Sequence, residues 1–349
     1  MKNGLSLTEL ATEIERQSNA KQDYIVPTSL LTMTDRADLH FDTGAGLTSI
    51  PATDLAHDQI AARLDIPRSY YNRLRTNDKA LLAQNVNKWL HDKPEKRMVR
   101  TLDGKARAFL SDRYERIDNL EIASAALPAL MDTGARVESS QITDSRLYIK
   151  AVMPKIEGEV RKGDVVQAGV VISNSEVGQG SVLIYPMIFR LVCLNGAIMA
   201  DSRFSARHLG GKIGTSTDVA HLLSNEALMA NDRAIMLKVR DVIRASFDSA
   251  VFQQRLELMR DAAKDRLQGD VVEAVEALSK RHTLTDSEGS GILRHLIEGG
   301  DLTRYGLHNA VTRHAHDVDS YDRATGLETL GGHILTLRPT EWRTISIAA

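Results

Sequence analysis

Leu147-Tyr148-Ile149-Lys150-Ala151-Val152-Met153 is the stretch of the sequence that decides the fold. Its apolar residues alternate with Tyr148, Lys150 and Val152, and this spacing predicts a half-buried strand because successive side chains of a strand point to opposite faces. Residues 165–173 and 181–192 are also rich in β-forming residues, and a loop softened by glycines joins them. The three segments predict an antiparallel sheet with a long β-hairpin.

Helical segments surround this predicted sheet. Asp118 and Asn119 can cap a helix that runs to Met131, with Gly134 just past its end. Residues 54–92 and 219–267 carry apolar residues at helical spacing, as do the residues that follow two capping boxes. The capping boxes are Ser6-Leu7-Thr8-Glu9 and Thr285-Asp286-Ser287-Glu288.

The order of these elements predicts an α+β fold in which a central antiparallel sheet with a long β-hairpin packs on helices. We expect three parts, in the order of the chain. They are a helical N-terminal lobe with a helix-turn-helix-like corner (1–96), an α+β core (97–212) and a helical C-terminal lobe (213–349).

The composition is that of an ordinary globular protein, with 349 residues of which 42% are hydrophobic and 26% charged. A net charge of −2 excludes a uniformly basic nucleic-acid coat protein but allows local basic patches. The single cysteine, Cys193, fits a reducing compartment, and its apolar neighbours predict a buried, inert thiol. No leader-like or membrane-spanning apolar stretch is present, so we expect a cytoplasmic protein without a membrane partner.

Positive charge is concentrated in two islands. Residues 63–116 carry 14 basic and 7 acidic residues, and residues 190–212 carry 4 basic and 1 acidic. The segments before, between and after them are net acidic, so a polyanion would be repelled everywhere except at the islands. The alternative is that each island is an ordinary solvated face.

In the first island, Lys105 and Arg107 share a strand face with Phe109, which suits phosphate contact combined with base stacking. The alternative is ion pairing of Arg113 and Arg116 with Asp112, Glu115 or Asp118, and both can hold at once. In the second island, glycines beside basic residues would let the backbone approach a phosphate closely. Neither island contains a nucleotide-binding fingerprint, so we expect no cofactor. The candidate nucleic-acid-binding residues are Arg97, Arg100, Lys105, Arg107 and Arg113 on one wall, with Arg203, Arg207, His208 and Lys212 opposite.

Residues 60–74 have the layout of a helix-turn-helix, in which Asp65 takes the place of the usual turn glycine and Pro67 opens the second helix. The corner either carries a DNA-reading helix or is purely structural.

Sequence signals for a catalytic site are weaker than those for binding. His314 and His316 would coordinate a metal together only on a strand, since i and i+2 do not share a helix face. An acidic cluster of Asp112, Glu115 and Asp118 could serve a metal-dependent nuclease, although the interleaved arginines favour ion pairing.

Three stretches together resemble the phage/plasmid-like proteins of domain-of-unknown-function family 932. They are residues 59–74 with 85–90, residues 107–114 with 117–119, and residues 174–178 with 190–196, echoed by residues 305–312. The resemblance implies a mobile-element setting and transfers no catalytic residues. The order of one helix and three strands also resembles the core of phage single-strand annealing proteins, which bind strands in a basic groove around an oligomeric ring.

The sequence thus favours a non-enzymatic, homo-oligomeric protein that binds or anneals single-stranded DNA in recombination or replication. Three alternatives stay open. They are a sequence-specific duplex binder that uses residues 60–75, a metal-dependent nucleic-acid enzyme, and an inhibitor or scaffold that binds a host protein.

Overall fold

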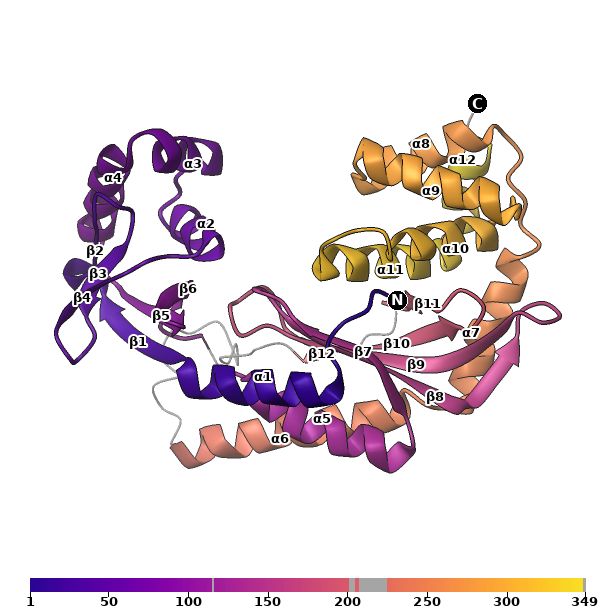
Figure 1. The fold of residues 1–349 in the computed structure, drawn as a ribbon, viewed down its shortest axis with the longest axis horizontal. Coiled ribbons are helices and arrows are strands. Elements are labelled where there is room, and N and C mark those ends of the chain that lie inside the picture. Colours follow the sequence, from indigo (N-terminus) through magenta and orange to yellow (C-terminus); the bar gives the residue numbers. More distant parts are fainter. Residues whose placement is uncertain (115, 201–204, 207–224, 348–349) are drawn as a thin grey trace.

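The structure is a computed structural model that describes residues 1–114, 116–200, 205–206 and 225–347, the side chains of 205–206 and 225–232 excepted. It has the predicted α+β fold, with helices around antiparallel sheets. An N-terminal lobe and a helical C-terminal lobe stand at opposite ends of a central sheet, on the same side of it (Figure 1).

The central sheet follows the order of the chain. Its strands are β7 (Arg136–Ile142), β8 (Leu147–Glu159), β9 (Val165–Asn174), β10 (Val182–Arg190) and β11 (Asn195–Ile198), and β12 (Ser205–Ala206) pairs with β10. All pairings are antiparallel, with Ile149 opposite Ile172 and Tyr185 opposite Val171. The predicted strands and hairpin are confirmed, while β7 was not predicted and β8 continues past residue 153.

Helices cover both faces of this sheet. Three lie below it in Figure 1, namely α1 (Leu7–Ala20), α5 (Asn119–Thr133) and α6 (Asn225–Ala245). Ile149, Ala151 and Met153 of β8 pack into this core, while α10 (Arg304–His314) and α11 (Tyr321–Leu335) lie over the other face. The prediction that β8 is half-buried is therefore wrong, because Lys150 is fully buried against Glu328 of α11.

The N-terminal lobe contains two small sheets and three helices. The sheets are β1 (Gln22–Pro27) with β5 (Lys96–Leu102) and β6 (Lys105–Ser111), and β2 (Thr32–Met33) with β3 (Leu39–Asp42) and β4 (Leu47–Ile50). The helices are α2 (Asp54–Arg63), α3 (Arg68–Asn77) and α4 (Lys79–Asp92), with a 3₁₀ turn at Thr28–Leu30. The predicted β5–β6 hairpin turns at Asp103 and Gly104, both with positive φ, and pairs with β1 rather than with the central sheet.

The C-terminal lobe packs helices around its own apolar core. Before α10 come α8 (Val271–His282) and α9 (Asp286–Gly299), and α12 (Pro339–Ser346) follows α11. The preceding helix α7 (Ser249–Ala262) instead buries its apolar residues in the core of the central sheet. The predicted capping boxes form at Ser6 with Glu9 and at Thr285 with Glu288. Among the helices of the described segments, none is long and apolar enough to cross a bilayer.

The prediction of a buried Cys193 is wrong. Residues 191–194 form a turn in which Cys193 is half-buried, and its neighbours Val192 and Leu194 are 61% and 59% exposed. The apolar run suggested burial, but Leu194 takes a positive φ and the chain turns back there into β11. Arg190 Nη1 lies 3.2 Å from the Cys193 sulfur.

Candidate nucleic-acid interface

Arg100, on β5, is completely buried and held by three oxygen-bearing partners. Its Nε lies 2.7 Å from Asp23 Oδ1, and its Nη2 lies 2.9 Å from Asp118 Oδ1. Its Nη1 donates to the backbone carbonyl of Glu176 at 2.7 Å. Burial alone would raise the pKa of Asp118, but hydrogen bonds from Lys21 and Arg100 lower it overall. Arg100 therefore holds the fold together and presents no charge to a phosphate.

Arg107, on β6, makes a second buried ion pair, with Glu176 in the loop after β9. Its Nη2 lies 2.6 Å from Glu176 Oε2, and the Glu176 side chain is 4% exposed. The other oxygen of Glu176 accepts the backbone N–H of Asn119 at 2.6 Å and lies 3.3 Å from Lys21 Nζ. Three segments that carried the sequence resemblance, around residues 107, 119 and 176, therefore meet at one carboxylate.

Arg97 is also engaged inside the N-terminal lobe. Its guanidinium pairs with Glu95 and lies 6.0 Å from the centre of the Phe109 ring. Phe109 is 1% exposed and belongs to the core of that lobe, so its ring cannot stack on a base. The expectation that Phe109 stacks on a base beside Lys105 and Arg107 is therefore wrong.

Lys105 and Arg113 are the two members of the first wall that remain exposed. Neither side chain has an ion pair with any residue that the structure describes. Arg116 does pair, with Asp23 at 3.2 Å. The residues of the opposite wall, Arg203, Arg207, His208 and Lys212, lie outside the described residues, as does Glu115 of the acidic cluster.

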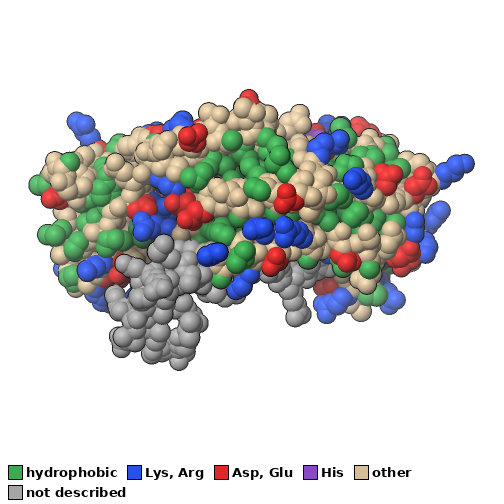
Figure 2. All heavy atoms as spheres, turned by 90° about the horizontal axis from the view of Figure 1, so that it is seen from below, with side chains coloured by type: hydrophobic (Ala, Val, Ile, Leu, Met, Phe, Trp, Pro, Cys, Tyr) green, Lys and Arg blue, Asp and Glu red, His purple; other side chains and the backbone are tan. Residues whose placement is uncertain are grey.

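A basic row that the sequence analysis missed lies on α6, the first described helix after residues 203–212. Arg233, Lys238 and Arg240 are exposed and have no carboxylate partner among the side chains that the structure describes. On the opposite side of α6, Ile235, Val239 and Ile243 are buried in the core below the sheet. Seen from below, this side of the molecule carries basic and hydrophobic side chains next to each other (Figure 2).

A groove of about 560 Å³ runs between α5 and α6 beside this row. Arg233 and Arg240 line it together with the exposed Leu120 and Leu237, and Glu121 is its one acidic lining residue. Glu121 is already engaged, because its carboxylate accepts the backbone N–H of Asp118 in the capping box of α5. The groove thus combines free positive charge with apolar surface.

The spacing in the sequence could have revealed this row. Arg233, Leu237 and Arg240 stand at i, i+4 and i+7, which places these two arginines on one face of a helix, whereas Lys238 at i+5 lies off that face. Counting charge over residues 213–349 hid them, because 20 acidic residues outnumber 16 basic ones there. The face is visible only when the helical period is applied to the charges as well as to the apolar residues.

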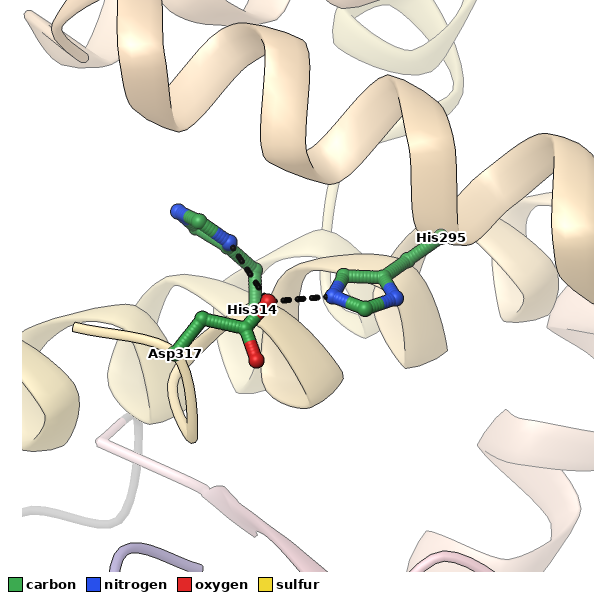
Figure 3. A group of neighbouring side chains, drawn as sticks. All are labelled: His295, His314 and Asp317. Carbon is green, nitrogen blue, oxygen red and sulfur yellow. Dashed lines mark hydrogen bonds and ion pairs between the residues drawn. The ribbon is translucent and has the colours of Figure 1, made fainter.

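His295, His314 and Asp317 form a compact cluster between α9 and the turn after α10 (Figure 3), with their ligand atoms within 4.8 Å of one another. Asp317 Oδ2 lies 2.6 Å from His295 Nε2 and 3.4 Å from His314 Nδ1. Arg294 Nη2 donates to the same oxygen at 2.9 Å. Three side-chain nitrogens therefore converge on one oxygen of Asp317, and the arrangement fits an ion-pair network.

His316 points elsewhere, as the helical context predicts. Its Nε2 lies 2.7 Å from the amino nitrogen of Met1, so His314 and His316 do not converge on one position. Asp118 of the proposed acidic cluster is bound to Lys21 and Arg100, which supports the ion-pairing interpretation for that residue.

The helix corner is present at the expected position. Helices α2 and α3 are joined by residues 64–67, and Asp65 takes the left-handed conformation, with φ of 53°, that favours glycine in such turns. Tyr71 of α3 is buried, and its hydroxyl oxygen lies 2.8 Å from Nδ1 of His57 on α2, a contact that holds the two helices together. Arg68 is exposed at the start of α3 and contacts Asp58 at 2.5 Å.

These features define a class of α+β protein in which a buried ionic network joins an N-terminal lobe to an antiparallel sheet, and a basic helix is exposed below that sheet. Residues 107–344 match the family described as Domain of unknown function (DUF932), and the chain belongs to that family. The matched residues include the Glu176 network from Arg107 onward and all of α6, but not the helix corner. No curated protein and no solved structure matches the chain significantly.

Proposed function

We propose that this chain is a non-enzymatic DNA-binding protein of a phage or plasmid, which binds and anneals single strands in recombination or replication as a homo-oligomer. One observation carries the proposal: the basic row of Arg233, Lys238 and Arg240 is exposed on α6 without described carboxylate partners. Basic side chains not neutralised by the protein are the ones that can replace the counterions of a nucleic-acid backbone.

The row is suited to a flexible strand. Arg233 and Arg240 are seven residues apart, a rise of about 10 Å along a helix axis, so both lie within about one Debye length and act on the same strand. Leu120 and Leu237, which line the groove between them, offer apolar contact to unstacked bases.

The topology gives further support by analogy. Helix α5 precedes the antiparallel strands β7 to β11 and packs below them, an arrangement that resembles the core of phage single-strand annealing proteins. In such proteins a basic groove holds the strand without a metal or nucleotide. Lys105 and Arg113, the exposed residues of the first island, are secondary candidates for phosphate contact.

The test is fluorescence anisotropy of a labelled single-stranded oligonucleotide over a series of salt concentrations, with duplex as competitor. Wild-type protein is expected to bind with strong salt dependence and to prefer single strands. Arg233→Ala/Arg240→Ala should weaken binding, whereas Arg36→Ala/Lys93→Ala, which removes the same charge from exposed positions of the N-terminal lobe, should not. Absence of binding at low salt would refute the proposal and direct the search to a protein partner.

The helix corner favours a second candidate, a duplex DNA binder that uses α3. Asp65 forms the tight turn, and Arg68 and Arg73 are exposed on α3. This candidate expects a preference for one duplex sequence that Arg68→Ala relaxes. A competition assay with random duplex distinguishes it from the single-strand proposal, which expects no such preference.

A further inference from the structure

A pocket of about 660 Å³ opens in the C-terminal part of the chain and shares no lining residue with the groove beside α6. Its lining comes from Leu258 of α7, the segment between α7 and α8, the start of α10, the end of α11 with the two residues after it, and the face of α12. Its volume falls in the range of small-molecule sites, roughly 300–1,000 Å³. Nothing in the proposed DNA-binding function uses it.

The pocket lining is strongly basic. Four cationic residues line it, against the single carboxylate of Asp265; the four are Lys264, Arg266, Arg304 and Arg343. Lys264 pairs with Asp261 at 2.8 Å, outside the pocket lining. Arg266 and Arg343 are exposed, and neither side chain has an ion pair with any residue that the structure describes. Two free guanidinium groups therefore stand at the pocket and favour an anionic occupant.

Arg304 is a third cationic residue of the lining, and its side chain is held in place by two contacts. Its Nη1 donates to the carbonyl of Leu337 at 3.1 Å and its Nη2 lies 3.0 Å from Asp265 Oδ2. Its Nε is buried and has no hydrogen-bond partner, while the Asp265 side chain is 41% exposed and has room to turn outward. A tetrahedral anion that displaces this carboxylate would accept from both Nε and Nη2, the paired geometry that guanidinium groups give to phosphate.

Part of the remaining lining is apolar, and backbone hydrogen bonds hold the neighbouring segments together. Leu335, Leu337, Pro339 and Trp342 form this part of the wall. The N–H groups of Gln268 and Gly269 donate to the carbonyl of Ser346 at 2.8 and 2.7 Å, which ties the segment after α7 to α12. A ligand that fills the pocket therefore needs an apolar or planar body in addition to its anionic group.

We propose that this pocket binds a phosphate monoester of about mononucleotide size, with the phosphate between Arg266, Arg304 and Arg343 and a planar or apolar group against the wall formed by Pro339 and Trp342. The occupant is a small molecule, because the volume of the pocket is that of small-molecule sites.

Isothermal titration calorimetry of the full chain with adenosine 5′-monophosphate tests the proposal, with adenosine and inorganic phosphate as the two halves of the ligand. The monophosphate should bind at low salt, and adenosine should bind at least about tenfold more weakly, because it lacks the charged hydrogen bonds. Arg266→Ala/Arg343→Ala should lose about tenfold or more in affinity. Both positions are exposed, so this variant is expected to fold.

Arg36→Ala/Lys93→Ala removes the same charge from the N-terminal lobe and should bind the monophosphate as the wild type does. The proposal is overturned if the wild type does not bind the monophosphate, or if the pocket variant and this control bind it equally. Neither result depends on DNA binding, because the α6 variant Arg233→Ala/Arg240→Ala should keep full affinity for the monophosphate.

Discussion

Arg107 and Glu176 form a buried ion pair that joins the N-terminal lobe to the central sheet. Arg107 Nη2 on β6 lies 2.6 Å from Glu176 Oε2 in the loop after β9. Since Lys21 and the backbone of Asn119 contact the other oxygen of Glu176, elements from three parts of the chain depend on one carboxylate. Positive charge that looks available for nucleic acid in the sequence is used here to connect two cores.

We expect Glu176→Gln to destabilise the protein by about 3 kcal/mol, because removing one partner of a buried pair leaves the opposite charge unpaired. Arg107, which is about nine-tenths buried, would lose its counter-charge, whereas Lys21 would keep its ion pair with Asp118. Urea denaturation followed by circular dichroism measures the loss. Glu15→Gln, at an exposed position on α1, should stay within about 0.5 kcal/mol of wild type. Equal stabilities for the two variants would show that the network contributes little.

A second buried pair fixes the C-terminal lobe on the sheet. Lys150 Nζ on β8 lies 2.5 Å from Glu328 Oε2 on α11, and both side chains are fully buried. We expect Lys150→Met alone to cost about 3–5 kcal/mol, because Glu328 would be left as an uncompensated charge. The double variant Lys150→Met/Glu328→Leu should recover most of that loss, since apolar pairs of similar volume replace buried ion pairs well. A double-mutant cycle in urea gives the coupling, and additive losses would contradict the interpretation.

Much of the fold could be predicted from local signals in the sequence. The capping boxes at Ser6 and Thr285, the glycine after α5 and the Asp103-Gly104 turn all act within a few residues, so the chain shows them directly. The burial of β8 on both faces could not be found in the same way, because Lys150 in a strand is usually solvent-exposed. Its partner Glu328 lies 178 residues later, and no local pattern indicates that contact.

The basic islands show the same limitation at the site. Charge counting locates Arg100 and Arg107 correctly as part of a positive segment, but it cannot show that Asp23, Asp118 and Glu176 fold against them. The basic row of α6 shows the reverse case. Acidic neighbours in the sequence cancel its charge in a count over the segment, yet its side chains are exposed in the structure. Whether a cation is free depends on tertiary pairing, which only the structure supplies.

The stability of the protein should fall as the pH drops from about 6.5 towards 4. Burial lowers the pKa of His308 to about 4, and burial also lowers the pKa of His57 to about 4. Below the ordinary histidine pKa, near 6.5, the unfolded chain binds protons that the folded protein does not, so each histidine costs on the order of 1 kcal/mol per pH unit in this window.

Urea denaturation between pH 7 and 5 measures this dependence, in a range where folded carboxylates with lowered pKa values, such as that of Glu288 at about 2, stay ionised. His308→Gln retains a donor for the carbonyl of Gly331 and should flatten the slope. An unchanged slope in both His308→Gln and His57→Gln would mean that the two histidines are not buried in neutral form.

The contribution of α6 to DNA binding can be tested one charge at a time. Arg240 is exposed, lines the groove between α5 and α6, and has no described carboxylate partner. If it contacts a phosphate, Arg240→Ala should reduce the slope of log affinity against log salt by roughly one, without changing the preference among sequences. A variant of Arg100 cannot serve as the control, because Arg100 is buried in the ionic network. Arg36→Ala, which removes one exposed charge from the N-terminal lobe, is the matched control and should leave the slope unchanged. Equal slopes for the wild type, Arg240→Ala and Arg36→Ala would show that Arg240 does not contact a phosphate. Lys105 and Arg113 would then be the next residues to test.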